Sequence, residues 1–205
     1  MALYSAKDFT RLLGTPGFSN ALLTQHFELY RGYVKNVNVL HDELAAASPG
    51  KPPLPSWSEL KRRFGWEWNG MRLHEMYFED LTKVRVKPED AAGLGTQISR
   101  DFGSREEWER EFRATGSLRG VGWAALVWDA GARRLFNVWL DEHDRGQLAG
   151  CPVLLLMDVF EHAFMHDYGT KRGDYIDAFL AAADWGLAAH RFETARTPVR
   201  EVAHA

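Results

Sequence analysis

Midway along its length the chain reads GWAALVW at residues 122–128, DAG at 129–131 and RLFNVWL at 134–140. The two apolar runs are rich in Trp, Val and Leu, and the stretch between them has the Asp and Gly that are typical of a turn. This pattern predicts an antiparallel hairpin. A third apolar segment at residues 151–160 predicts another buried strand, so the sequence indicates a small antiparallel sheet.

The part before the hairpin has the pattern of helices. Ser19 is a suitable N-cap for a helix over residues 20–44, where apolar and aromatic residues recur at spacings of three and four. Residues 48–55 are rich in proline, which lacks a backbone donor and ends this helix. A second helix is expected to begin at Ser56 or Ser58, because either side chain can cap it.

A separate helical segment is expected over residues 69–81, which would complete an N-terminal helical hairpin. The following stretch is polar, and we place a boundary near Pro88. The sequence therefore predicts an all-helical lobe over residues 1–87 and a mixed lobe over residues 88–205.

The second lobe adds helices to the sheet. Helices are expected at residues 89–102, 104–115 and 174–187, and Ser104 followed by Glu107 fits a capping box. The predicted fold class is α+β, with an N-terminal helical hairpin lobe and a C-terminal α/β lobe that carries a small three-stranded antiparallel sheet.

Composition excludes several classes of protein. The 205 residues are 45% hydrophobic and 26% charged, and the formal net charge of −3 argues against a protein that binds nucleic acid or an anionic membrane. The single cysteine, Cys151, excludes an intrachain disulfide framework and a cysteine-only metal cluster. No apolar run is long enough to cross a bilayer, and the start of the chain does not resemble a secretory signal, so we expect a cytoplasmic protein.

Asp158 and His162 are the first candidates for chemistry. Asp158 ends a strongly apolar run, where a buried carboxylate is costly unless it is paired or binds a cation. On a helical turn His162, four residues later, would face the same side. A carboxylate and an imidazole together suit Zn, Mn or Fe. The alternative is a buried aspartate that caps the helix containing His162.

His26 and His74 extend this pair to a candidate ligand set. Each stands among large apolar residues, where a single histidine is more often a core residue than a ligand. Together with Asp158 and His162 they give three imidazoles and one carboxylate, drawn from both predicted lobes. Such a set leaves a position open on a five-coordinate metal, as a redox or hydrolytic site requires.

Several segments resemble the iron/manganese superoxide dismutase family, over nearly all of the chain. The strongest is DVFEHAF at residues 158–164, which is similar to the family's D-x-W/F-E-H-A-Y signature. NGMRLH at residues 69–74 resembles the segment of the family's second ligand, and His26 with GYVKN at residues 32–36 resembles that of the first. Further similar stretches are DFGS at residues 101–104 and GVGW at residues 120–123.

The resemblance implies a superoxide dismutase that holds one Fe or Mn ion per subunit, with solvent as an additional ligand. It implies that the protein ligands are His26, His74, Asp158 and His162. It also implies that Tyr33 is a gateway tyrosine at the substrate channel. In this reading superoxide is converted to dioxygen and hydrogen peroxide.

The resemblance also implies surroundings and assembly. Trp123 and Phe160 would belong to an aromatic shell that keeps the site dry, and Arg172 would help to steer the anionic substrate. Glu161 would reach across the interface of a homodimer, or of a dimer-based tetramer, to the metal-binding histidine of the partner subunit.

The sequence departs from the family pattern near the first ligand. The gap between His26 and Tyr33 is one position shorter than usual, and counting back the usual gap from Tyr33 reaches Gln25. We prefer His26, because imidazole binds such metals far better than an amide and because His26, Tyr30 and Tyr33 share one helix face. The shortening would remove a local bulge from the helix.

Polar partners of the family are also replaced. Tyr30 stands where a second histidine is usual, and Met165 stands where the tyrosine that meets this histidine across the dimer is usual. Gly70 occupies one usual place of an outer glutamine, and His143 falls at the other. A neutral His143 could donate a hydrogen bond to bound solvent, and the alternative is an exposed turn histidine.

Two other functions stay open at this point. One is a non-catalytic protein that keeps this fold for metal binding or interaction, against which the complete ligand set argues. The other is a metal-dependent hydrolase or oxygenase, which needs a larger substrate pocket than the predicted aromatic packing leaves.

Overall fold

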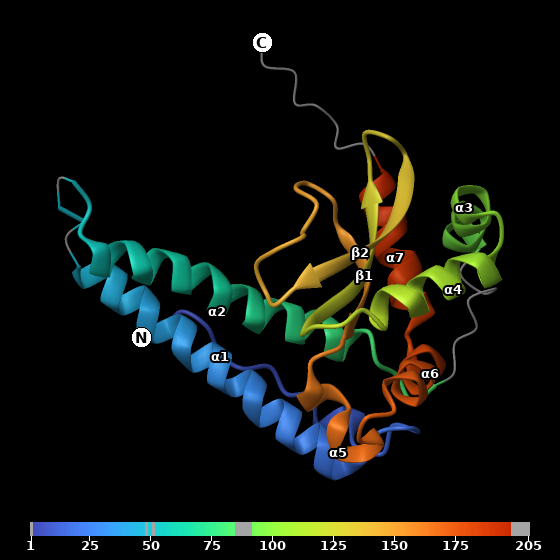
Figure 1. Cartoon of the computed structure of the whole chain (residues 1–205), viewed down its shortest axis with the longest axis horizontal. Coiled ribbons are helices and arrows are strands. Elements are labelled where there is room, and N and C mark those ends of the chain that lie inside the picture. The colour runs from blue at the N-terminus through green and yellow to red at the C-terminus, as the bar shows by residue number, and fades with distance from the viewer. Residues whose placement is uncertain (1, 48, 51, 85–91, 198–205) are drawn as a thin grey trace.

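A helical hairpin forms the first half of the molecule. The structure is a computed structural model that describes residues 2–47, 49–50, 52–84 and 92–197. After a short 3-10 helix, η1 (Thr10–Leu12), the helices α1 (Asn20–Ala46) and α2 (Pro55–Glu79) lie side by side (Figure 1). The side chain of Ser19 caps α1 as predicted, accepting a hydrogen bond from the Leu22 N–H at 3.0 Å.

The expectation of two separate helical segments after the prolines was wrong. The helix α2 begins with Pro55, whose fixed φ suits a first helical position, and continues through Gly65 and Gly70. A glycine inside a helix costs about 1 kcal/mol relative to alanine, which packing against α1 can offset. As a result, Trp66, Asn69 and His74 lie on one continuous helix.

The predicted three-stranded antiparallel sheet is confirmed. It consists of β1 (Gly122–Asp129), β2 (Arg134–Asp141) and β3 (Val153–Asp158) in the order β2-β1-β3. The central strand β1 is almost wholly buried, as its continuous apolar run requires. Its Trp123 pairs with Leu140 on one side and with Asp158 on the other, so the register fixes where Asp158 lies.

The second half of the described chain also contains the helices α3 (Ala92–Phe102), α4 (Arg105–Gly116), α5 (Met165–Tyr168), α6 (Arg172–Ala182) and α7 (Trp185–Arg196), and the 3-10 helix η3 (Glu161–Ala163) between β3 and α5 (Figure 1). Of these, α3, α4 and α7 pack against strands of the sheet, whereas α5 packs against η3 and α6. The Ser104 side chain caps α4 as predicted. The expected boundary near Pro88 and the first residues of the helix expected from residue 89 lie outside the described residues.

The expected single helix over residues 174–187 is two helices, α6 and α7, so this prediction was wrong. Ala183 leaves the helix to form an isolated bridge with Leu81. The Asp184 N–H donates to the Asp80 carbonyl at 2.8 Å, and the Asp184 side chain caps α7 by accepting from the Leu187 N–H at 2.9 Å. The chain therefore breaks where it meets the end of α2.

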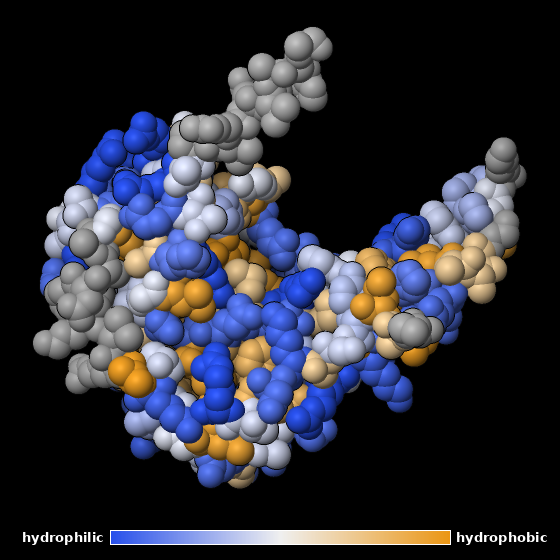
Figure 2. Space-filling model, turned by 180° about the vertical axis from the view of Figure 1, so that it is seen from behind, coloured by the Kyte–Doolittle hydropathy of each residue, from blue (hydrophilic) through white to orange (hydrophobic). Residues whose placement is uncertain are grey.

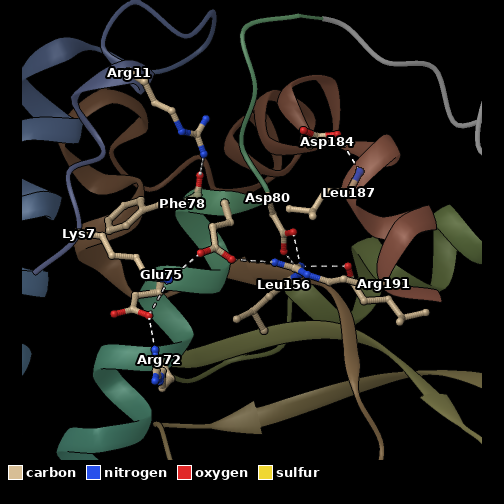
Figure 3. A network of polar contacts seen from close by, with 12 residues as sticks. Lys7, Arg11, Arg72, Glu75, Phe78, Asp80, Leu156, Asp184, Leu187 and Arg191 are labelled. Atoms are coloured by element: carbon tan, nitrogen blue, oxygen red, sulfur yellow. Dashed lines mark hydrogen bonds and ion pairs between the residues drawn. The ribbon is translucent and has the colours of Figure 1, made fainter. Parts of the chain in front are cut away.

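A buried polar network fastens the end of α2 to the second half of the chain (Figure 3). The Asp80 carboxylate, fully buried, accepts hydrogen bonds from the Leu156 N–H at 2.8 Å and from the Arg191 guanidinium at 2.5 Å. Arg11 donates from the N-terminal segment to the carbonyls of Phe78 and Leu81. These contacts hold α2, β3 and α7 in fixed relative positions.

The helical hairpin extends from the rounded body as an arm, and apolar residues reach the surface along it (Figure 2). Val39 on α1 and Leu54 just before α2 are among the exposed large hydrophobic residues. Within the part of the chain that the structure describes, no helix has the combined length and apolarity needed to cross a membrane.

Candidate metal centre

The carboxylate of Asp158 lies at the centre of a buried cluster. Asp158 ends β3, and its Oδ1 accepts a hydrogen bond from the Phe160 N–H at 2.9 Å, which fixes the carboxylate plane. Its Oδ2 lies 3.2 Å from His26 Nε2, 3.1 Å from His162 Nε2 and 3.7 Å from His74 Nε2. Three imidazoles therefore face one carboxylate oxygen.

Four different elements bring these residues together: α1 carries His26, α2 carries His74, β3 ends in Asp158, and η3 carries His162. One candidate ligand atom from each residue lies within 4.8 Å of the others. Gln25, the alternative first ligand, is exposed, whereas His26 is buried in the cluster. The four residues that the sequence singled out as a ligand set converge.

The hydrogen bond of His74 fixes which of its nitrogens is free. Nδ1 lies 2.6 Å from the Gly70 carbonyl oxygen, which can only accept, so Nδ1 carries the proton. The Nε2 lone pair then points into the cluster, 3.4 Å from His162 Nε2. Nitrogen and oxygen donors converging without a cation side chain among them suit a divalent or trivalent metal ion of the Fe, Mn or Zn type.

The protonation states also suit a metal ion. Burial lowers the pKa of His26 and lowers that of His74 well below its usual value, so both imidazoles are neutral at pH 7. Burial alone would raise the pKa of Asp158. The close contacts with His162 and His26 outweigh burial and hold the pKa of Asp158 well below its usual range. The cluster is thus a carboxylate anion among imidazoles, the form that ligates metals.

Beside the cluster, hydrogen bonds connect Trp123, His143 and Tyr33. Trp123 Nε1 can only donate, and it lies 3.1 Å from His143 Nδ1, so Nδ1 must be the acceptor. The proton of the neutral His143 ring is therefore on Nε2, which donates to the Tyr33 hydroxyl at 2.8 Å. The Tyr33 hydroxyl keeps its own proton free to donate elsewhere.

The His143 side chain is fully buried, although its backbone lies in a turn. The alternative of an exposed turn histidine was therefore wrong. Burial lowers the pKa of His143 to about 4 and raises the pKa of Tyr33 above its usual value, so both groups are neutral at pH 7.

The absence of a side chain at Gly70 leaves room for the Tyr33 ring. A Cβ atom at Gly70 would lie 2.5 Å from Tyr33 Cδ1, closer than any real contact. The Tyr33 ring therefore packs directly on the backbone of α2, with its centroid 5.0 Å from that of His74. Any side chain at position 70 would displace this tyrosine.

Aromatic rings close the site. The Phe160 ring stacks on His143 at 4.9 Å and on His162 at 5.2 Å between centroids, and Trp123 lies edge to face with His74 at 5.0 Å. Trp66 packs on His143 at 4.6 Å, a neighbour that the sequence analysis missed. Its position two helical turns before His74 was a signal, but only if α2 was taken as one helix.

Tyr30 does not lie on the surface where a partner subunit could meet it. It is fully buried between α1 and α2, where its hydroxyl accepts from the Lys7 N–H at 3.0 Å and donates to Glu75 at 2.9 Å. Leu29, one residue earlier, is exposed instead. The helix α1 runs without a bulge through this region, as the shortened spacing predicted.

The remaining predicted residues lie closer to the surface of the molecule. Met165 and Glu161 are exposed, and the side chain of His162 is 26% exposed. Arg172 donates to the Leu118 and Gly120 carbonyls, at 2.6 and 3.2 Å, and its guanidinium lies over the Phe164 ring. Arg172 thus also ties α6 to the segment before β1.

Comparison with known proteins agrees with this geometry. Residues 90–191 match the family described as iron/manganese superoxide dismutases, C-terminal domain. The chain is 37% identical over 182 residues to "Superoxide dismutase [Mn] 2" of Haloferax volcanii, covering 88% of this chain and 89% of that protein. The chain belongs to the iron/manganese superoxide dismutase family.

Relatives in this family carry names with either metal. "Superoxide dismutase [Fe]" of Cupriavidus metallidurans is 39% identical over 182 residues, covering 87% of this chain and 90% of that protein. "Superoxide dismutase [Fe]" of Aquifex pyrophilus is 34% identical over 195 residues, covering 92% of this chain and 91% of that protein. The similarity therefore extends over both the helical hairpin and the sheet region.

Proposed function

We propose that this chain is a superoxide dismutase that binds one Fe or Mn ion per subunit through His26, His74, Asp158 and His162. The observation that carries the proposal is the convergence of these side chains within 4.8 Å, in a chain whose relatives over most of its length are named superoxide dismutases. The two lobes, residues 1–87 and 88–205, each supply two ligands, so the site exists only in the folded molecule.

The bound ion supplies one-electron redox chemistry: one superoxide is oxidised to dioxygen, and a second superoxide, with two protons, is reduced to hydrogen peroxide. The chain's own residues hold the ion and set its charge. The single carboxylate, Asp158, lowers the net charge of the site by one unit. The imidazole of His74 is held by the Gly70 carbonyl, which fixes its orientation.

The hydrogen bonding and the neutral charge of Tyr33 and His143 suit them to interact with solvent and with the anionic substrate. Because His143 Nε2–H already donates to the Tyr33 oxygen, the Tyr33 O–H is directed away from His143, free to donate to solvent or to superoxide. Neutral His143 and neutral Tyr33 place no negative charge in the path of an anionic substrate. The rings of Trp66, Trp123 and Phe160 exclude bulk water, which strengthens these hydrogen bonds.

We further propose a homodimer, or a tetramer built from dimers. Glu161, adjacent to His162, is exposed, and its side chain makes no hydrogen bond or ion pair with another of the described residues. Its carboxylate suits a role as acceptor for His162 of the partner subunit. Exposed Leu29 and Met165 would add apolar contacts to the interface, and light scattering of the purified protein measures the assembly.

Metal analysis of the purified protein, with dismutase assays after loading with Fe and with Mn, tests the function. We expect close to one ion per chain and activity with at least one of the two metals. Absence of activity with both metals, at full metal occupancy, would refute the catalytic proposal. We also propose a cytoplasmic location, which cell fractionation tests.

A further inference from the structure

His143 occupies an unusual position for a turn residue. Its neighbours Asp144 and Arg145 are exposed, yet its own imidazole is fully buried beside Tyr33. The preceding residue, Glu142, has φ of 50°, in the left-handed region that side chains other than glycine rarely adopt. Such a conformation persists only where the surroundings fix it, so the turn must be held in place by specific contacts.

Two side chains of α2 supply these contacts. Trp66 Nε1 donates to the Glu142 carboxylate at 2.9 Å, and Asn69 Nδ2 donates to the His143 carbonyl at 2.8 Å. Because Trp66 and Asn69 are three residues apart on a helix, they project from the same face and reach adjacent residues of the turn.

The carbonyl oxygen of His143 accepts its hydrogen bonds from side chains. Among the backbone hydrogen bonds of the described residues, none ends on this oxygen. Besides Asn69, its donor is the amide of Gln147, at 3.2 Å. Gln147 is exposed and its hydrogen bond is longer, so Asn69 is the stronger of the two constraints.

The same helix carries the other fixed points of the site. His74 is five residues after Asn69, and Gly70 forms the surface on which the Tyr33 ring packs. Fastening the turn to α2 therefore fixes the His143 imidazole relative to both the metal cluster and the Tyr33 hydroxyl.

We propose that Trp66 and Asn69 act as a two-point clamp, defined by the Trp66–Glu142 and Asn69–His143 hydrogen bonds, that positions His143 for the reaction. The inference rests on the proposed function. Both are positioning residues, since they act through His143. A displacement of about 1 Å at such a group is enough to lower turnover substantially.

Asn69→Ala is the first test. Asn69 is half-buried on α2 and alanine is a strong helix former, so the variant is expected to fold. We expect kcat to fall about tenfold, the cost of one well-formed hydrogen bond, with metal content unchanged. In the crystal structure of the variant, His143 Nε2 should lie farther from the Tyr33 hydroxyl than 2.8 Å.

Asn38→Ala is the matched control. The Asn38 amide also binds backbone carbonyls, those of Tyr4 and Val34, but it does so on α1 outside the cluster. Its loss should lower the melting temperature while kcat stays within twofold of wild type. An equal loss of kcat in both variants would indicate a general structural effect and overturn the proposal.

A double-mutant cycle separates positioning from structure. If Asn69 acts through His143, the variant Asn69→Ala/His143→Ala should match His143→Ala in kcat within about twofold. If the two losses multiply, Asn69 acts independently of His143 and the clamp is refuted. An unchanged kcat for Asn69→Ala, with His143 still 2.8 Å from Tyr33, would refute it as well.

The Trp66–Glu142 hydrogen bond is tested by changing Glu142, because Trp66 itself packs on His143. Glu142→Gln keeps an oxygen acceptor for the indole N–H and should retain kcat, whereas Glu142→Ala removes it and should lower kcat several-fold. Equal kcat in these two variants would show that the Trp66–Glu142 hydrogen bond does not position His143. If the metal-loaded wild type proves inactive, the proposed function fails, while the crystal structures of the same variants still test the clamp.

Discussion

Asp80 and Asp158 are two fully buried carboxylates next to the same strand, and they differ in what surrounds them. Asp80 accepts from the Leu156 N–H within β3 and pairs with the guanidinium of Arg191 (Figure 3). Asp158, at the end of β3, faces three imidazoles instead. Arginine carries its positive charge permanently, whereas neutral imidazoles bring lone pairs.

Burial of an acid therefore does not by itself indicate a metal site. The charge of Asp80 is already balanced within the protein, so this residue has a structural role. Asp158 has no permanent cation beside it, and its partners are themselves ligands. A metal ion would balance its charge and use all three imidazole lone pairs.

Asp158→Asn should have the largest effect on function. The amide keeps the size of the side chain but removes the anionic ligand. We expect loss of most bound Fe or Mn and a fall in dismutase activity well beyond the roughly 100-fold typical of outer partners of a metal ligand. Elemental analysis and activity measured together check this, and full metal occupancy in the variant would contradict it.

Asp80→Asn should have the opposite profile. Removing the charge of Asp80 leaves the Arg191 guanidinium with only the longer ionic contact to Glu79, at 3.3 Å, and we expect the free energy of unfolding to fall by about 3–5 kcal/mol. The metal content of the folded protein should be unchanged, because no ligand contacts Asp80. Denaturant titration measures the loss, and Asp80→Asn/Arg191→Gln should recover part of it. A loss of metal in Asp80→Asn would erase the distinction between the two carboxylates.

The sequence predicted one of these carboxylates and missed the other, for a physical reason. Asp158 stands within a compact motif, DVFEH, whose ligand-type residues are local in the chain. The partners of Asp80 come from β3 and from Arg191, which is 111 residues away, and a pairing at that separation leaves no local pattern. The break between α6 and α7 was missed because it depends on contacts with the end of α2.

The same reasoning applies to the candidate site. His26, His74, Asp158 and His162 could be selected by residue type and by resemblance, and the sheet followed from its apolar runs. The contacts of His143 with Trp66 and Asn69 could not, because they depend on α2 being one helix and on the strained backbone at Glu142. Residue identity predicts ligands better than it predicts the contacts that orient them.

Lowering the pH should test how the buried imidazoles affect the stability of the protein. Burial lowers the pKa of His143 to about 4, whereas an unfolded histidine titrates near 6.5. Between these values the unfolded state binds more protons, so the stability of the metal-free protein should fall as the pH drops from about 6.5 to 4. This residue alone accounts for at most about 3 kcal/mol, and His26 and His74 act in the same direction.

His143→Gln removes the titrating group while keeping a side chain that can donate and accept hydrogen bonds. Denaturant titrations of the metal-free wild type and of this variant, at several pH values, should show a shallower acid dependence in the variant. Parallel curves for the two proteins would mean that His143 is not held neutral by the fold.

Glu79→Gln should have the smallest effect, although Glu79 precedes Asp80 in the same network. Its side chain is 36% exposed and bridges Lys7 at 2.8 Å and Arg191 at 3.3 Å, where water and salt screen the charges. Losing Glu79 also relieves repulsion of Asp80, whose pKa is raised to about 7 mainly by burial and in small part by Glu79. We expect less than about 1 kcal/mol of destabilisation, and less still at high salt. If this substitution costs as much as Asp80→Asn, then burial does not decide the strength of these pairs, and the contrast between structural and ligating carboxylates loses its physical basis.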